Sequence, residues 1–407
     1  MKRKNKGSNT VIIIAIAALL VLSTVTIFAA STSVNGRQLY QFTDGLHANP
    51  QSTLVADARG NLYGTTVDQL RSGTDTGCIY SWNVATNQVV SVHGFCGLSN
   101  CGDGYLPAGD LSILGNQIFG VTDLGGANDE GTVFQLDLTS QQLTVLYSFG
   151  SQPNDGYEAS GGVIPDTTGL TNNLYGTTME GGSQGGGTLY AVDRTTHQET
   201  VLWDFCATTG QSCDTSDGNE PQGELYIDKA GNVYGTAASG GSGGVFGFGT
   251  VFEYVPATGK LVILHTFSGA RDGENPTSRL VADSAGNLYG ATENTVFQLT
   301  PTYKVIYNTV SGQDGDTIND LTFDRSGALW GTAQFGGTHD AGTVFRLTNS
   351  GGVWRETFNH SFLGRKDGRN PRGGMYIRGN QLYGSTFDGG DTTSCELGCG
   401  TIFRLTE

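Results

Sequence analysis

The sequence has few charged residues, and basic residues are the scarcest of them. Only 15% of its 407 residues are charged, and 38 acidic residues outnumber 22 basic ones, so the formal net charge is -16. Phosphate backbones repel such a surface, which argues against nucleic acid as a partner. The plain interpretation of the acidity is solubility.

Sustained helical patterns and long apolar runs are also lacking after residue 30. Short apolar-polar alternations separated by Gly, Asn, Asp, Ser and Thr take their place, and 63 residues are Gly. This pattern predicts many short strands joined by tight turns. The regular spacing of Leu, Tyr, Phe and Val indicates a packed core rather than disorder.

Residues 1–33 form a separate element, a basic tip followed by an apolar segment. The apolar run over residues 11–30 would be about 30 Å long as a helix, which is enough to cross a bilayer. We expect an uncleaved single-pass anchor in the cell membrane with the rest of the chain outside. Cleavage near the small residues 29–33, and hence secretion, is the alternative. Both place residues 34–407 outside the cytoplasm.

One short phrase, clearest in residues 60–66 (GNLYGTT), recurs seven times and predicts a repeat architecture. Each repeat reads as four strands, as in residues 54–57, 62–66, 132–136 and 146–149 of successive copies. The aromatic residue of the phrase is Tyr63, Phe119, Tyr175, Tyr234, Tyr289, Trp330 or Tyr383. Third strands are expected to begin at Cys78, Thr132, Thr188, Thr250, Thr295, Thr343 and Thr401. The glycine after each aromatic predicts close backbone approach between packed strands.

The two ends of the repeat region complement each other. The final repeat stops after its third strand at residues 400–405, and residues 38–42 read as a fourth strand with no third strand before it. Pairing of the two would leave no exposed sheet edge. We therefore predict an all-β fold, a seven-bladed β-propeller of four-stranded blades over residues 34–407. An open solenoid is the alternative, and it would leave both partial units unpaired.

The order of motifs in each repeat is similar to a known family. The succession NLYGTT, GG, GTVF, LYSF and DGxxP resembles the GloVer-type tandem repeat of "choice-of-anchor" bacterial surface proteins. The resemblance covers about residues 38–407 and implies export and a repeat architecture. It carries over no catalytic residue. The copy around Tyr289 departs from the pattern because it lacks the Gly-Gly loop, and the copy around Trp330 lacks the Asn.

The loops between second and third strands and between consecutive blades vary most, and together they define what we call the variable face. Binding sites usually lie on variable loops of a rigid scaffold, so we predict the binding face there. Its candidate residues are Asp123, Asp129, Glu130, Asp217, Glu220, Asp272, Asp314, Asp316, His339, Asp367 and Asp388. Clustered carboxylates would suit Ca²⁺, although no cofactor is predicted outright. The alternative is that the Asp of each Asp-Gly pair caps a turn.

Six of the seven cysteines form close pairs in this region. Outside the cytoplasm we expect disulfides between Cys96 and Cys101, Cys206 and Cys213, and Cys395 and Cys399. Zinc is disfavoured because the first two pairs stand two blades apart. A bridge between Cys78 and Cys96 competes with the first pairing.

No catalytic constellation emerges from the sequence. Ser183 and Ser242 match the nucleophile-elbow pattern but have no helix after them, and the scattered His47 and His339 do not form a dyad. We expect an extracytoplasmic binding module for a glycan or a protein. The alternatives are an enzyme acting on carbohydrate or a lactone, with calcium near the axis, and a passive envelope scaffold. Carboxylates at the axis together with a metal would favour the enzyme, and a carboxylate-poor axis would favour the binder.

Overall fold

The computed structural model describes residues 36–42, 48–67, 76–206, 216–241, 247–300, 302–309, 315–390, 395 and 397–406. These residues all belong to one compact unit, Ser33–Glu407. The anchor predicted in residues 1–33 lies outside the described residues. The same holds for His47, Cys213, Ser242 and Asp314, and predictions about them stay predictions.

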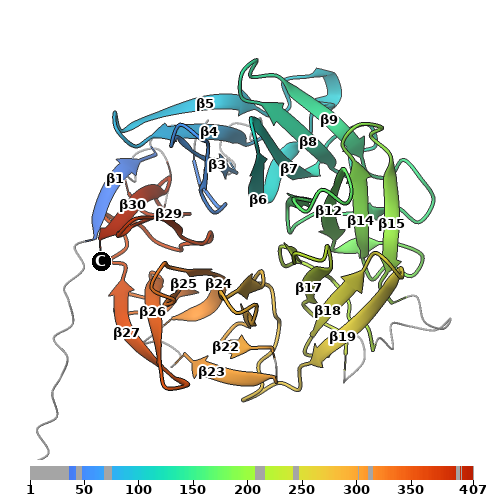
Figure 1. The fold of residues 1–407 in the computed structure, drawn as a ribbon. Helices are drawn as coiled ribbons and strands as arrows, with labels where there is room; N and C mark the ends of the chain where they lie inside the picture. Colours follow the sequence, from blue (N-terminus) through green and yellow to red (C-terminus); the bar gives the residue numbers. More distant parts are fainter. Residues whose placement is uncertain are drawn as a thin grey trace, which may run out of the picture. The chain divides into compact units, whose positions relative to one another are not determined.

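Seven four-stranded antiparallel sheets follow one another around a common centre (Figure 1). From the inside outward, blade 1 consists of β2 (Val55–Ala56), β3 (Leu62–Thr66), β4 (Cys78–Asn83) and β5 (Gln88–Gly94), and blade 2 of β6 (Tyr105–Leu114), β7 (Gln117–Leu124), β8 (Thr132–Asp137) and β9 (Leu143–Ser148). In the same order, blade 3 consists of β11 (Val163–Pro165), β12 (Asn173–Thr178), β14 (Thr188–Asp193) and β15 (Glu199–Asp204). Blade 4 consists of β16 (Tyr226–Ile227), β17 (Val233–Ala237), β18 (Thr250–Val255) and β19 (Lys260–Thr266). Blade 5 has β20 (Val281–Ala282), β21 (Leu288–Ala291), β22 (Thr295–Gln298) and β23 (Lys304–Asn308); blade 6 has β24 (Asp316–Phe323), β25 (Leu329–Phe335), β26 (Thr343–Ser350) and β27 (Val353–Ser361); and blade 7 has β28 (Tyr376–Arg378), β29 (Gln381–Thr386), β30 (Thr401–Thr406) and β1 (Arg37–Gln41). Two small elements complete the architecture, a sheet of β10 (Gly156–Tyr157) with β13 (Glu180–Gly181) and a 3-10 turn at Ser99–Cys101.

The predicted all-β, seven-bladed propeller is confirmed. All seven third strands begin at the residues predicted from the repeat. In blade 7 the strand from the amino-terminal end lies outermost, since β1 pairs antiparallel with β30 in the register Tyr40 to Ile402 and Gln41 to Thr401 (Figure 1). The first strand therefore completes the sheet whose other strands come from the end of the chain.

The core lies between neighbouring blades rather than inside any single sheet. Tyr63 of blade 1, for example, packs with Ile118 and Phe134 of blade 2 in one buried cluster. The glycine beside each phrase aromatic makes room for the third-strand ring: a Cβ on Gly120 would lie 2.5 Å from Phe134 Cζ. The predicted close approach at these glycines is therefore what the packing requires.

The turns on the face opposite the variable face are held by one recurring aspartate. Asp228 accepts hydrogen bonds from the backbone N–H groups of Ala230 and Asn232, at 2.8 and 2.9 Å, and from the hydroxyl of Tyr234 at 3.1 Å. Equivalent carboxylates follow the inner strands of blades 1, 5 and 6. Side-chain capping of this kind keeps these turns short, so length variation is confined to the other face.

Candidate functional site

Each inner strand contributes one residue to what we call the axial ring. Seven equivalent buried apolar residues lie in the inner strands or directly before them, and the residue before each of them faces the opposite way, toward the centre, because side chains alternate along a strand. The axial ring comprises Thr53, Asp110, Gly162, Glu224, Arg279, Asp320 and Gly374. Three carboxylates and one guanidinium therefore meet where seven blades converge.

Direct contacts join the charged members of the axial ring. Arg279 Nη2 lies 3.1 Å from Asp320 Oδ2, and Arg279 Nη1 lies 3.6 Å from Glu224 Oε2. The backbone N–H of Asp110 donates to Glu224 Oε1 at 2.8 Å, and that of Thr53 donates to Asp110 Oδ1 at 2.5 Å. Only 9% of the Asp320 side chain and 15% of the Glu224 side chain are exposed. The network therefore joins five blades in a largely desolvated place.

Burial and mutual repulsion shift the pKa values of these acids. Burial raises the pKa of Glu224 well above its ordinary value, and the charge of Asp110 adds to that effect. Burial likewise raises the pKa of Asp320 to about 6, although Arg279 opposes the rise. Burial alone would lower the pKa of Arg279, but the attraction of Asp320 and Glu224 outweighs it and the net shift is upward. One fixed positive charge thus faces both Glu224 and Asp320, which cannot both ionise at low cost.

Above the axial ring lies a cavity of about 530 Å³, which we call the axial cavity. Its wall includes residues that stand two positions before the axial ring in their blades, namely Gln51, Ala108, Ser160, Gln222, Thr277 and Arg372. Residues at the ends of second strands, such as Asp123 and Met179, at the start of β6, namely Leu106, and in interblade loops, such as Glu158, also line it. Because both kinds of loop belong to the variable face, the cavity lies on the face predicted from the sequence to carry the binding site.

A second cavity of about 460 Å³ lies on the other side of Arg279. Inner-strand side chains such as Ile164, Tyr226, Val281 and Phe323 line it, so that it is mainly apolar. Arg279 borders both cavities. The charged ring therefore lies between a cavity on the variable face and a second cavity below it.

Of the predicted site residues, Asp123 alone lines the axial cavity within the described part of the chain. Three others belong to Asp-Gly pairs and bind the outer strand before them or the residues that directly follow it. The carboxylate of Asp217 accepts from Trp203 Nε1 at 3.1 Å, Asp272 contacts His265 Nε2 at 3.3 Å, and Asp367 accepts from the backbone N–H of Leu363 at 2.9 Å. These contacts agree with the alternative interpretation, in which the aspartate caps its loop.

The remaining predicted site residues are dispersed over the loops. Asp129 accepts from the backbone N–H of Gly125 at 3.2 Å, Asp316 from that of Thr317 at 2.9 Å, and Asp388 from Asn370 Nδ2 at 2.7 Å. Glu220 lies 3.5 Å from the Ser239 hydroxyl. Glu130 is half-buried beside Gly150, and His339 is exposed. The structure does not bring these residues together.

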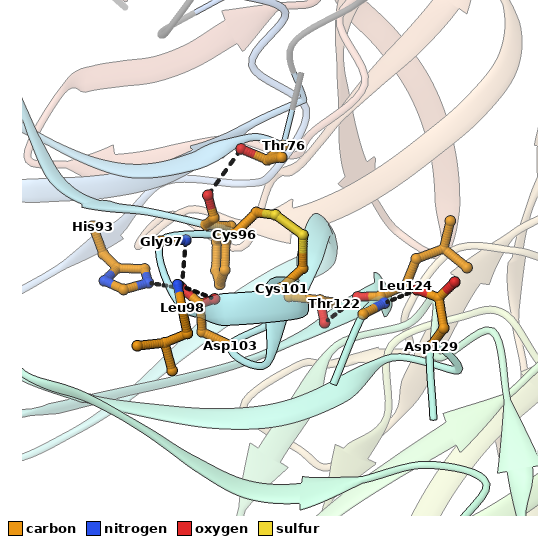
Figure 2. Close-up of a disulfide and its surroundings, with 12 residues drawn as sticks. Thr76, His93, Cys96, Gly97, Leu98, Cys101, Asp103, Thr122, Leu124 and Asp129 are labelled. Carbon is orange, nitrogen blue, oxygen red and sulfur yellow. Dashed lines mark hydrogen bonds and ion pairs between the residues drawn. A yellow bond between two sulfur atoms is a disulfide. The ribbon is translucent and has the colours of Figure 1, made fainter. Parts of the chain in front are cut away.

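Two predicted disulfides are present, Cys96–Cys101 and Cys395–Cys399. Figure 2 shows the first beside Asp103 and Thr122, and the Cys101 carbonyl accepts from Gly126 N at 3.0 Å. This loop is therefore fastened to blade 2.

The alternative Cys78–Cys96 bridge is wrong, because the sulfur of Cys96 is bonded to Cys101. Cys78 pairs across the sheet with Gly94, so Cys96 lies beyond the paired strands, and the buried Cys78 Sγ lies 3.2 Å from Thr66 Oγ1. The third predicted pair includes Cys213 and lies outside the described residues.

Two negative findings apply to the described residues. No helix in that part of the chain has the length and apolar character needed to span a bilayer. No three His, Cys, Asp or Glu side chains there converge in a way that could hold a metal ion. In the axial ring the guanidinium of Arg279 stands among the carboxylates instead.

The axial ring was missed by reasoning from the sequence, which concentrated on loops. The signal lies in one column of the repeat, the residue before the equivalent buried apolar residue of each blade (Leu54, Leu111, Val163, Leu225, Leu280, Leu321 and Met375), where the blades read Thr, Asp, Gly, Glu, Arg, Asp and Gly. A column of the repeat in which charges of both signs occur indicates residues that face the centre of the propeller. Aligning the seven copies on the inner strand, rather than on the GNLYGTT phrase, would have found it.

Comparison with solved structures supports the fold. Two structures of an extracellular domain from B. thetaiotaomicron, one described as part of a hybrid two-component system and the other of a one-component system, match with TM-scores of 0.58 and 0.57 at 12% and 11% identity. Each match covers 90% of this chain, which spans only about 40% and 39% of those domains. At such identity the likeness shows the fold alone.

Among curated protein sequences, none matches this chain. A family model does match, over residues 21–216 and 172–295, and so covers more than half of the sequence. The chain belongs to the Gloeobacter/Verrucomicrobia repeat family.

Proposed function

We propose that residues 34–407 form a binding module outside the cytoplasm, and that a small polar ligand occupies the axial cavity. The observation that carries this proposal is the cavity of about 530 Å³ on the variable face, lined by residues from all seven blades. A cavity of this size, with a few converging polar groups, is typical of small-molecule sites. The residues at its wall differ from blade to blade, as expected where a repeat scaffold serves recognition rather than packing.

Export is supported by two features. The bonded pairs Cys96–Cys101 and Cys395–Cys399 are of a kind that persists in oxidising compartments. Two of the similar solved structures are extracellular domains. Residues 11–30 would then tether the module to the cell membrane, with secretion after cleavage as the alternative.

The test is a ligand screen on the full-length chain. A panel of mono- and oligosaccharides, amino acids, short peptides and carboxylic acids is added while thermal unfolding is followed, and hits are measured by calorimetry. We expect at least one compound to raise Tm and to lose affinity on Gln222→Ala, a wall substitution. A hit that Gln222→Ala, Thr277→Ala and Ser160→Ala all leave unchanged would place binding elsewhere and refute the proposal.

An enzyme acting on carbohydrate or a lactone is the second candidate, and the carboxylates at the axis favour it. Burial raises the pKa of Glu224 well above its usual range, as suits a group that donates a proton near neutral pH. Turnover of aryl glycosides or lactones by the wild type, abolished in Glu224→Gln, would support it. Against it stands Arg279, whose guanidinium occupies the space between Glu224 and Asp320.

A further inference from the structure

The polar groups of the axial cavity fall into two classes. Those of the axial ring satisfy one another through the contacts of Arg279. Several wall side chains above the ring have no such partner within the described residues. Half-buried polar groups without a protein partner are costly unless water or a ligand satisfies them. The wall side chains that lack a protein partner therefore indicate which kind of ligand the cavity binds.

The acidic part of this wall comes from blades 2 and 3. Asp123 ends the second strand of blade 2, and Glu158 precedes the inner strand of blade 3. Neither carboxylate accepts a hydrogen bond from any described residue. Burial raises the pKa of both, and for Glu158 the charges of Glu180, Asp123 and Glu130 add to the rise. No basic group among the described residues opposes the rise of either pKa, so the acidic pole would gain from an incoming cation.

The basic part of the wall comes from blade 7. The guanidinium of Arg372 stacks over the ring of Phe387, with Cζ 3.5 Å from the ring centroid, and its Nε is buried with no hydrogen-bond partner among the residues that the structure describes. Burial lowers the pKa of Arg372, and the charge of Asp388 opposes that shift. Neither Asp123 nor Glu158 contributes, so Arg372 is not the counter-ion of the acidic pole. A stacked guanidinium keeps its N–H edge free for a carboxylate.

We propose that the axial cavity binds a zwitterion, with its anionic group on Arg372 and its ammonium group on Asp123 and Glu158. This inference rests on the proposed function and names its ligand class. A neutral sugar would leave both poles unpaired, and a simple cation would leave Arg372 unpaired. A metal ion does not suit the site either, because the described carboxylates do not converge around one point.

The size of the cavity sets the separation of the two charges. A sphere of 530 Å³ is about 10 Å across, and an extended peptide spans about 3.5 Å per residue. The two charges of a free amino acid are too close to reach both poles, whereas the termini of a two- or three-residue peptide match the distance. The ligand is therefore a short peptide or a molecule with the same charge separation.

The test uses the full-length chain and four probes: trialanine, N-acetyl-trialanine, trialanine amide and the doubly capped peptide. We expect trialanine to bind at least tenfold more tightly than either singly capped form. In Arg372→Gln, amidation of the peptide should cease to matter while acetylation still weakens binding. In the Asp123→Asn/Glu158→Gln variant the pattern should reverse. Arg355→Gln, an exposed site on β27, and Glu274→Gln, on the variable face outside the cavity wall, are the matched controls.

The outcomes separate this inference from the proposal beneath it. If capped and free peptides bind alike, or if only an uncharged compound from the screen binds in the cavity, the zwitterion assignment is refuted and the binding module stands. If no probe and no compound binds, both fail. Tm is recorded for each variant, so a variant that does not fold is recognised, and Arg372→Lys then replaces Arg372→Gln as a charge-preserving change that removes the planar fork.

Discussion

Arg279 Nη2 lies 3.1 Å from Asp320 Oδ2, and Arg279 borders both the axial cavity and the second cavity below it. The two residues occupy the same position in adjacent blades. Their contact links the blades through the centre, in addition to the apolar packing between the sheets. The stability of the ring therefore depends on the ionisation of its central acids.

The first prediction concerns pH. Burial raises the pKa of Asp320 to about 6 in the folded protein, above its ordinary value of 3.8. The folded state thus binds the Asp320 proton more tightly than the unfolded state does. The contribution of this proton to the free energy of unfolding is therefore lost as pH rises from about 4 to 6, and the loss is about 3 kcal/mol at most. Asp320→Asn should show a shallower decline over that window. Urea unfolding at half-unit pH steps measures it, and parallel curves for variant and wild type would contradict the prediction.

The second prediction concerns the guanidinium. Arg279→Met removes the one cation that contacts Glu224 and Asp320 among the described residues and should cost about 3 kcal/mol at pH 7.5, since it leaves desolvated carboxylates uncompensated. Adding Glu224→Gln to Arg279→Met removes one of those charges and should restore part of the loss. Urea unfolding of both variants is the measurement. A double variant less stable than Arg279→Met would show that charge is not the cause.

The third prediction concerns a hydroxyl that the fold does not use. Tyr190 Oη is buried and has no hydrogen-bond partner in the described part of the chain, and the equivalent residues of blades 2 and 4–7 are Phe. Tyr190→Phe should therefore stabilise the protein by about 1 kcal/mol, because an unsatisfied buried hydroxyl is removed. Tyr147→Phe is the control and should destabilise, because Tyr147 donates to Asp155 Oδ2 at 2.6 Å. Tm values of the two variants that move in the same direction would count against this reasoning.

Much of the fold was predictable because the repeat displays its packing requirements seven times. Each glycine that faces a third-strand ring, such as Gly120 against Phe134, recurs in every copy and marks a second strand. The pairing of β1 with β30 followed from a missing strand at one end and an extra one at the other. Local pattern and global topology agree at these positions, as expected of a foldable sequence.

The candidate site was less predictable. Structural residues recur in each copy of the repeat, whereas residues that bind a ligand differ from copy to copy. The Asp-Gly carboxylates were predicted as site residues because they recur on the variable face. Their recurrence instead indicates a shared turn, since Asp217 and Asp272 contact the strand before them. Arg372 has no arginine at the equivalent position of another blade, whereas Glu158 shares its position with Glu220 of blade 4, which does not line the cavity. Which of these residues share one cavity depends on how seven inner strands converge, and no local pattern contains that information.

The fourth prediction concerns the backbone at the rim of the axial cavity. Leu106 has a φ of 54°, in the left-handed region, where the equivalent residues of blades 1, 5 and 7 are Asn49, Asn275 and Asn370. Asn tolerates this conformation far better than Leu does. Leu106→Asn should therefore raise stability by about 1 kcal/mol, measured by urea unfolding. Asn275→Leu is the reverse change in another blade and should lower it, and a gain there would refute the argument from strain.

The last prediction tests whether the strand from the amino-terminal end belongs to the core of blade 7. Phe42 follows β1, is fully buried, and packs edge-on against Tyr80 at 5.3 Å and Tyr40 at 5.0 Å between ring centroids. Phe149 holds the same place after the outer strand of blade 2 and is also fully buried. If both are core residues, Phe42→Ala and Phe149→Ala should each cost about 3–5 kcal/mol. Both losses are measured by urea unfolding. If Phe149→Ala shows the full loss and Phe42→Ala only a small fraction of it, β1 is only loosely attached. Comparable losses would mean that the ring unfolds as one unit, because a substitution where β1 pairs with β30 then lowers the free energy of unfolding as much as a substitution within blade 2.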